Sequence, residues 1–198
     1  MTGNSTSFVN KNREVILKIV SGGVAIALAM VLSNIRLFRM PMGGSVTLAS
    51  VLPIVVFCMA FGPSWGFAVA LVYSLLQLID AYMLSPFQVI LDYILGYLVL
   101  GITGFAALPA AERLKLKNPL QRFTHASFIK ALIMTFIAYV VRWFSCVLSG
   151  VIFYAEYAGD MNPWLYSMSY NGAFLAADFG VTAAVMAALY FTLKKAVK

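Results

Sequence analysis

Residues 15–35 read VILKIVSGGVAIALAMVLSNI, a run whose only charged residue is Lys18. A helix needs about 20 apolar residues to cross the hydrocarbon core of a bilayer, so this run predicts a transmembrane helix. No small-residue cleavage site stands beside it. We therefore interpret residues 1–14 as a polar N-terminal tail before a retained helix, and not as part of a signal peptide.

Five further apolar runs follow along the chain. They cover residues 48–61, 66–82, 85–108, 128–154 and 166–193, and the first of them is the shortest. We predict an all-α membrane protein whose six transmembrane helices form a single bundle. This bundle would be one transmembrane domain over residues 15–198, since no internal repeat indicates a second one.

The composition supports a membrane protein. Of the 198 residues, 62% are hydrophobic and 11% are charged, whereas a soluble domain has about 25% charged residues. The net charge of +7 does not indicate nucleic-acid binding, because the basic residues lie between apolar runs and at the chain ends. Cys58 and Cys146 both fall inside apolar runs, so we expect no disulfide framework, no metal site and no cofactor.

The basic residues also predict the orientation in the bilayer. They gather before the first run (Lys11, Arg13, Lys18), after the fourth (Arg113, Lys115, Lys117, Arg122) and in the C-terminal KKAVK. With six spans, these three segments lie on one side of the membrane. The positive-inside rule makes that side the cytoplasm, so both termini are expected there.

Polar side chains inside the predicted spans indicate a binding site. Asp92, Asn171 and Asp178 lie within apolar runs, where such groups are costly and commonly functional. Arg142 also lies deep in a span, and it either pairs with Asp178 or Asp92 or lines the site.

Tyrosines stand near the outer ends of the same spans, at positions 82, 93, 154 and 166 (Tyr82, Tyr93, Tyr154, Tyr166). Aromatic faces attract cations, and a carboxylate adds a charge partner. We therefore expect a pocket in the outer half of the bundle for a flat, cationic or hydrogen-bonding small molecule.

Catalytic motifs are missing from the sequence. It contains no phosphate-binding G-x-x-x-x-G-K-[ST], no nucleophile elbow and no H-E-x-x-H, and His125 stands in a basic loop. A membrane enzyme acting on lipids, with Asp92, Asp178 and Arg142 as its acid, base and clamp, would lack a metal or nucleophile. A structural scaffold would not need a buried acid among tyrosines.

Six helices without an inverted repeat are few for an independent transporter, so a transporter would take its energy from a partner.

Small residues in the first span suggest close helix packing. Ala25 and Ala29 are four residues apart, and Gly22 lies about one turn before them. This spacing lets helices approach closely. It indicates either a docking surface for a partner or packing inside the same bundle.

Five segments, over about residues 20–193, resemble the substrate-binding S-components of energy-coupling factor (ECF) vitamin transporters, and within them the thiamine-specific branch. They are MPMGGSVTLASVLPI (40–54), LVYSLLQLI (71–79), QVILDY (88–93), RWFSCVLSGVIFYAEYA (142–158) and PWLYSMSYNG (163–172). The resemblance implies a six-helix, multi-pass protein of the bacterial cell membrane that captures a vitamin from outside. It implies no enzymatic activity of the chain itself, and partnership with a membrane coupling subunit and two cytoplasmic ATPases.

The resemblance also implies roles for single residues. Asp92 stands where the family has an acidic ligand contact, and Tyr154 stands where a ring-stacking aromatic residue is expected. The remaining implied pocket residues are Tyr82, Tyr166 and Asn171, with Tyr93, Arg142 and Cys146 beside them. The segment with Met42 and Gly43 resembles the family's lid over the pocket, and Ala25 and Ala29 resemble its docking motif.

Two positions depart from the family pattern. The lid often reads P-Q-G-G-S, and Met42 replaces the glutamine here. The fifth helix commonly carries a pocket histidine where this chain has Cys146, whose thiol is small and only weakly polar. The expected ligand is thiamine, and a vitamin B6 vitamer or a pyrimidine precursor of thiamine remains an alternative.

Overall fold

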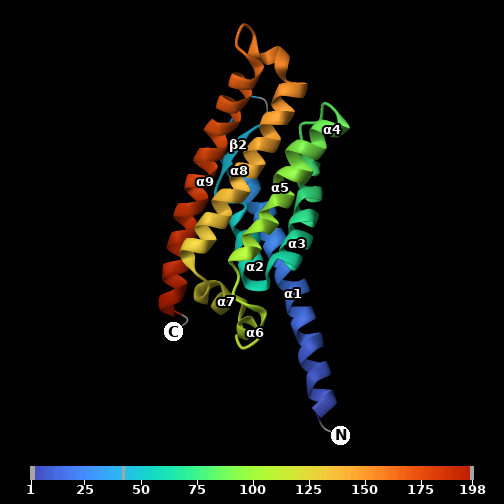
Figure 1. Cartoon of the computed structure of the whole chain (residues 1–198), viewed down its shortest axis with the longest axis vertical. Helices are drawn as coiled ribbons and strands as arrows, with labels where there is room; N and C mark the ends of the chain where they lie inside the picture. Colours follow the sequence, from blue (N-terminus) through green and yellow to red (C-terminus); the bar gives the residue numbers. More distant parts are fainter. Residues whose placement is uncertain (1–2, 42, 197–198) are drawn as a thin grey trace.

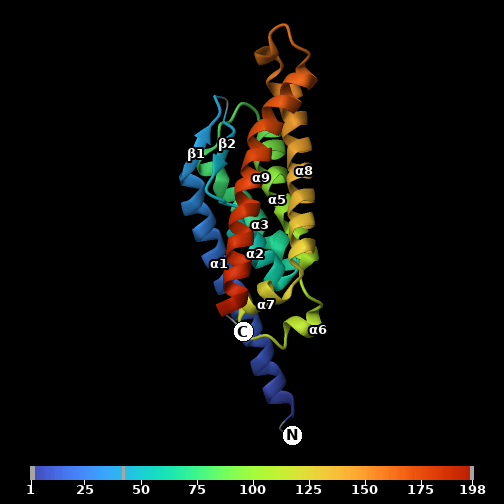
Figure 2. The same ribbon diagram turned by 90° about the vertical axis from the view of Figure 1, so that its left-hand side faces the viewer.

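The computed structural model describes residues 3–41 and 43–196. Its long helices run side by side along one axis and form an elongated bundle, and both chain ends lie at the same end of it (Figure 1). We call this the inner end and the opposite one the outer end. The turned view shows a short hairpin of two strands against the outer half of the bundle (Figure 2).

Five helical segments of the described chain are long and apolar enough to cross a membrane: Asn12–Asn34, Pro63–Asp80, Pro86–Ala106, Phe128–Phe153 and Pro163–Ala196. The first is part of α1 (Gly3–Asn34), which already begins inside the segment predicted as a polar tail. The second joins α3 (Pro63–Leu76) to η1 (Gln77–Asp80). The last two are α8 (Phe128–Phe153) and α9 (Pro163–Ala196), which η4 (Ala155–Ala158) connects.

The third of these spans changes its helical geometry along its length. It runs through α4 (Pro86–Val89), the π-helical η2 (Ile90–Leu95), α5 (Gly96–Leu98) and the 3₁₀-helical η3 (Val99–Ala106). This irregular span packs closely against α3. A Cβ atom at Gly104 would lie 2.6 Å from the Cα atom of Pro63. Only glycine permits that approach.

The second predicted span, at residues 48–61, is shorter in the structure than the sequence predicted, and it is not among the five segments long enough to cross a membrane. α2 covers only Leu52–Phe61, and ten residues rise about 15 Å, which is half of a hydrocarbon core of about 30 Å. Extended chain precedes it. β1 (Arg36–Arg39) and β2 (Ser45–Thr47) pair as an antiparallel hairpin, and the turn after β2 leads into α2.

A buried carboxylate anchors this extended chain. Asp178 Oδ1 accepts hydrogen bonds from the backbone N–H of Thr47 (2.8 Å) and from its hydroxyl (3.0 Å), and Tyr139 donates to Asp178 Oδ2 (2.7 Å). Irregular backbone at membrane depth is tolerated where it is buried in protein and its polar groups are satisfied. Asp178 therefore supplies a hydrogen-bond acceptor to backbone that is not helical. It does not form the ion pair with Arg142 that the sequence suggested as one possibility.

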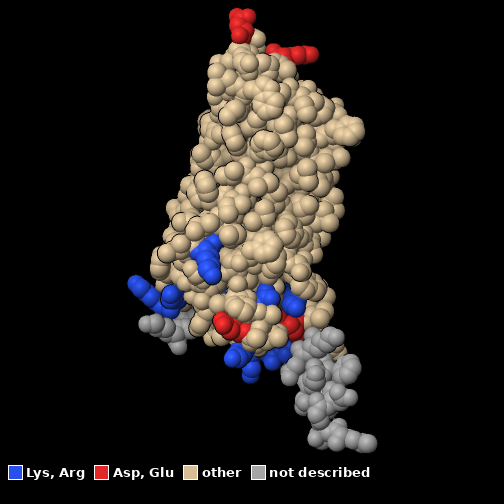
Figure 3. Space-filling view, viewed as in Figure 1, with Lys and Arg blue, Asp and Glu red and all other residues tan. Residues whose placement is uncertain are grey.

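The inner end is closed by two short helices, α6 (Ala110–Arg113) and α7 (Pro119–His125). Arg122 of α7 is 2% exposed and makes two hydrogen bonds to the Glu14 carboxylate of α1, at 2.7 and 2.8 Å. Figure 3 shows Lys and Arg side chains gathered at this end, together with some acidic ones. Further acidic side chains lie at the far outer end, and most of the surface between the two ends is uncharged.

The predicted docking residues Ala25 and Ala29 lie inside the chain's own bundle. They are 7% and 0% exposed, and Gly22 on the same side of α1 faces Val69 and Phe57 of the neighbouring helices. Neither side chain is accessible to a partner in this structure. Their spacing serves the packing of α1 on α2 and α3, which was the alternative left open.

Candidate ligand-binding pocket

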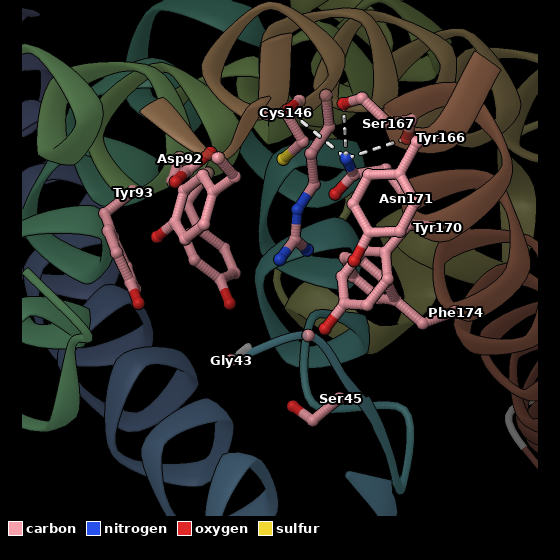
Figure 4. Close-up of a pocket in the computed structure, with 15 residues that line it drawn as sticks. Gly43, Ser45, Asp92, Tyr93, Cys146, Tyr166, Ser167, Tyr170, Asn171 and Phe174 are labelled. Atoms are coloured by element: carbon pink, nitrogen blue, oxygen red, sulfur yellow. Dashed lines mark hydrogen bonds between the residues drawn. The ribbon is translucent and has the colours of Figure 1, made fainter. Parts of the chain in front are cut away.

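A cavity opens in the outer half of the bundle, between the hairpin tip, the π-helical segment, α8 and α9. Its empty space is about 740 Å³, including the part at its mouth that is open to solvent. The lining residues are Gly43, Gly44, Ser45, Asp92, Tyr93, Tyr97, Arg142, Cys146, Gly150, Tyr154, Tyr166, Ser167, Tyr170, Asn171 and Phe174. Figure 4 shows Asp92 and Tyr93 on one side and Tyr166, Tyr170 and Phe174 on the other.

Most of the predicted binding residues meet in this cavity, although they come from four separate segments. They are Gly43, Asp92, Tyr93, Arg142, Cys146, Tyr154, Tyr166 and Asn171. Tyr82 does not line it. Its side chain is largely exposed, and its ring centroid lies 6.4 Å from that of Tyr154, which does line the cavity. Met42 lies outside the described residues.

Asp92 is presented by the π-helical turn of the third span. One of its oxygens accepts a hydrogen bond of 2.6 Å from Gln88 Nε2. The same turn is held from α8, where the Ser145 hydroxyl donates to the carbonyl of Leu91 (2.7 Å). π-helical turns occur frequently at functional sites, and this one places a carboxylate in the lining of a cavity that is rich in aromatic residues.

Arg142 reaches the cavity from α8 without a carboxylate partner. Among the side chains that the structure describes, ion pairs join Glu14 to Lys18 and Arg122, and Arg36 to Asp80. The predicted pairing of Arg142 with Asp178 or Asp92 is therefore not formed. Its guanidinium instead lies 4.0 Å from the centroid of the Tyr97 ring, and its buried Nε has no hydrogen-bond partner.

The contact between α8 and α9 fixes the floor of the cavity. Asn171 Nδ2 donates to the carbonyl oxygens of Ser167 (3.0 Å) and Cys146 (3.3 Å), and the Ser167 hydroxyl donates to the carbonyl of Val147 (2.9 Å). Gly150 makes room for this network, because a Cβ atom there would lie 2.1 Å from Ser167 Oγ. Asn171 itself lines the cavity beside this network.

The hairpin tip covers the cavity from the opposite direction. Gly43 has φ +102°, a conformation that other residues rarely adopt. A Cβ atom at Gly44 would lie 2.7 Å from the Phe174 ring. The consecutive glycines thus let the backbone turn tightly and rest directly on an aromatic side chain of α9.

Several lining residues were not identified from the sequence: Gly44, Ser45, Tyr97, Gly150, Ser167, Tyr170 and Phe174. Helical spacing contained a signal for some of them, since residues four apart share a helix face. Tyr97 follows Tyr93 by four positions, and Tyr170 follows Tyr166 by four. Gly150 likewise lies four residues from both Cys146 and Tyr154. Ser45 carries no such signal, because only the packing of the hairpin brings it to the cavity.

The fold and the cavity define a class: a multi-pass helical membrane protein with a partly enclosed cavity near one end of the helix bundle. The sequence model of the family described as thiamine transporter protein (Thia_YuaJ) matches residues 19–198. The chain belongs to this family. It is therefore a multi-pass bacterial membrane protein that acts as a transport subunit and not as an enzyme.

Two individual proteins are also similar to this chain. The thiamine transporter ThiT of Bacillus subtilis (strain 168) is 26% identical over 195 residues, which are 96% of this chain and 98% of that protein. The solved structure of ThiT from Listeria monocytogenes superposes with a TM-score of 0.71 at 24% identity, and the match covers 90% of this chain and 96% of that one. The second similarity shows that the fold is shared.

Proposed function

We propose that the chain is the substrate-capture subunit, or S-component, of an ECF transporter and that it binds thiamine in the cavity at the outer end. Family membership supports a role in thiamine transport. The observation that carries the proposal is the position of Asp92, which lines the cavity together with several tyrosines. The family and the Bacillus subtilis relative are named for thiamine, and nothing in these comparisons supports the vitamin B6 alternative.

The chemistry of thiamine suits this cavity. Its thiazolium ring is a flat cation, and its aminopyrimidine ring carries hydrogen-bond donors and acceptors. Tyrosine faces attract a cation by about 0.5–2 kcal/mol, depending on how far it is desolvated. The Asp92 carboxylate adds a charge partner, and Asn171 adds a polar amide to the lining of the cavity. Thiamine would thus meet both charge and stacking partners.

Energy for uptake would come from partner subunits. The sequence has no phosphate-binding loop, so ATP hydrolysis is assigned to two cytoplasmic ATPases joined through a membrane coupling subunit. We place that coupling subunit on the exposed side of α1. Gly23 and Ala27 are exposed there four residues apart, and a Cβ atom at Gly23 would meet nothing within 4 Å. Small residues at this spacing let a second helix approach closely.

The orientation follows from the charge distribution. Lys and Arg side chains gather at the end of the bundle where both chain ends lie (Figure 3), and the positive-inside rule makes this the cytoplasmic end. The cavity would then face the outside of the cell, where a capture subunit meets its substrate.

Titration of the purified protein, followed by tryptophan fluorescence, tests the proposal. Trp143 is a suitable reporter, because it follows Arg142 on α8 and its Nε1 donates to the carbonyl of Met168 on α9 (3.2 Å). We expect saturable quenching by thiamine. A response to pyridoxine, pyridoxal or pyridoxamine, with none to thiamine, would contradict the proposal and return the ligand to the vitamin B6 alternative.

A further inference from the structure

Arg142 is a buried cation that has no carboxylate partner among the described side chains. It is 9% exposed and lines the cavity. Its Nε has no hydrogen-bond partner, and no carboxylate among the described side chains lies within ion-pair distance of it. The neighbouring acids are engaged elsewhere: Asp92 accepts from Gln88, and Asp178 accepts from Thr47 and Tyr139.

The contacts that Arg142 makes do not satisfy all the hydrogen-bond donors of its guanidinium. The guanidinium lies over the Tyr97 ring, 4.0 Å from its centroid, and this contact stabilises the positive charge. It does not accept hydrogen bonds from the N–H groups, which point outward in the plane of the guanidinium. Cys146 lies one turn further along α8 and also lines the cavity, and a thiol is only a weak acceptor. An arginine side chain carries five N–H donors in a planar fork that favours oxygen or nitrogen acceptors.

We propose that Arg142 binds a hydrogen-bond acceptor of the ligand and thereby sets the ligand's orientation in the cavity. This inference rests on the proposed function and deepens it. The acceptor end of the ligand lies against Arg142, and the cationic ring lies away from it, toward Asp92 and the tyrosines. A guanidinium repels a second cation, so the reverse orientation is disfavoured.

The acceptor has two possible sources that share this chemistry. One is a ring nitrogen of the aminopyrimidine. The other is a phosphate oxygen, if the ligand is a phosphate ester of thiamine. Both kinds of group can accept from the guanidinium, and a phosphate would also match its charge.

Four ligands separate these sources when their affinities are measured by fluorescence titration. Thiamine carries the cation and the ring nitrogens. 3-Benzyl-5-(2-hydroxyethyl)-4-methylthiazolium keeps the cation and a six-membered ring but has no ring-nitrogen acceptor. The free 4-amino-5-hydroxymethyl-2-methylpyrimidine has the acceptors without the cation, and thiamine monophosphate adds a phosphate.

Arg142→Met is the test variant, because it keeps much of the apolar stem and removes the donors. Loss of a charge-assisted hydrogen bond weakens binding by about 10- to 100-fold. We expect such a loss for thiamine and the free pyrimidine, with the benzyl compound changed by less than about threefold. A loss confined to thiamine monophosphate would also support the proposal and would identify phosphate as the acceptor.

Equal losses for all four ligands, or no loss for any, would overturn the proposal. The proposed function would still stand in either case, because the unaltered protein binds thiamine. Failure of the unaltered protein to bind thiamine or its monophosphate would instead contradict the proposed function, and this inference with it.

Two controls keep the result interpretable. Arg13→Met changes an exposed arginine of α1, and it should alter none of the four affinities. If Arg142→Met does not fold, Arg142→Lys allows the same comparison, because it keeps the charge and loses the planar fork. We then expect the acceptor-bearing ligands to weaken by at least about fivefold, while the benzyl compound does not change.

Discussion

Asp92 and Arg142 are the two charged side chains that line the cavity, and they differ in how the protein satisfies them. Asp92 accepts a hydrogen bond from Gln88, whereas the buried Nε of Arg142 has none. Charges in a low dielectric act strongly on a ligand. A carboxylate and a guanidinium that do not neutralise each other therefore give the cavity two distinct ends.

Replacing Asp92 tests the carboxylate end. In Asp92→Asn the amide oxygen can still accept from Gln88, so the fold should persist while the negative charge is lost. We expect the affinity for thiamine to fall by more than about tenfold, which corresponds to about 1.4 kcal/mol. Isothermal titration calorimetry measures it. Asp160→Asn, an exposed change at the same end of the molecule, should have no effect, and unchanged affinity in Asp92→Asn would remove Asp92 from the site.

Gly150 tests the floor of the cavity. In Gly150→Ala the new methyl group would lie 2.1 Å from Ser167 Oγ and 3.4 Å from Asn171 Nδ2. We expect a loss of about 1–3 kcal/mol in stability from overpacking, together with weaker thiamine binding, because the Asn171 network must move.

Thermal unfolding with and without thiamine measures both effects of Gly150→Ala. Gly180→Ala in α9 is the matched control, since a Cβ atom there would meet nothing within 4 Å. It should be neutral or stabilising by up to about 1 kcal/mol, as for alanine in a helix interior. Equal behaviour of the two variants would contradict the packing explanation.

At the scale of elements, the path from β2 into α2 is the most unusual part of the fold. Val46, Thr47, Ala49 and Ser50 are buried although the chain there is not helical. Such backbone needs hydrogen-bond partners inside the bundle. Asp178 provides one for Thr47, and the same attachment holds the hairpin whose tip covers the cavity.

Asp178→Ala should loosen this attachment. It leaves the buried N–H of Thr47 without its acceptor, which costs about 1–3 kcal/mol, and it frees β2 from α9. We expect a lower unfolding temperature and faster release of thiamine, measured by stopped-flow fluorescence. In Asp178→Asn the side-chain oxygen can still accept from Thr47. This variant should therefore have a higher unfolding temperature and slower thiamine release than Asp178→Ala. If release is unchanged in Asp178→Ala, the hairpin is held by its other contacts.

At the scale of the whole molecule, the ion pair between Glu14 and Arg122 joins α1 to α7, at the end of the bundle opposite the cavity. Glu14→Gln leaves the buried Arg122 charge uncompensated, and removing one partner of such a pair costs about 3 kcal/mol. We expect a lower unfolding temperature with unchanged thiamine affinity. Glu112→Gln, at an exposed position of α6, is the control. A matching loss of affinity would show that the two ends are coupled.

Orientation is a further property of the whole molecule. Single cysteines introduced at Asp160 and at Lys195, both exposed and at opposite ends, can be labelled in intact cells with a membrane-impermeant thiol reagent. We expect labelling of the cysteine at position 160 and none at position 195 until the cells are lysed. The unaltered chain gives the background from Cys58 and Cys146. The reverse pattern would contradict an outward-facing cavity.

The sequence alone determined the class of fold and most of the pocket. Long apolar runs require helices in a bilayer, because the backbone must satisfy its own hydrogen bonds there, and five of the six predicted spans have the necessary length. Costly polar groups such as Asp92, Arg142 and Asn171 stand out in apolar runs, so they could be assigned to a cavity before any coordinates were known.

Only the tertiary structure decided which polar groups meet. Whether Asp178 pairs with Arg142 or binds the Thr47 backbone depends on how α9 packs against β2, and contacts between distant segments leave no periodic signal in the sequence. The same holds for Ala25 and Ala29, since their spacing suits a partner helix and a neighbouring helix equally. Side-chain spacing defines a helix face, and packing determines what that face contacts.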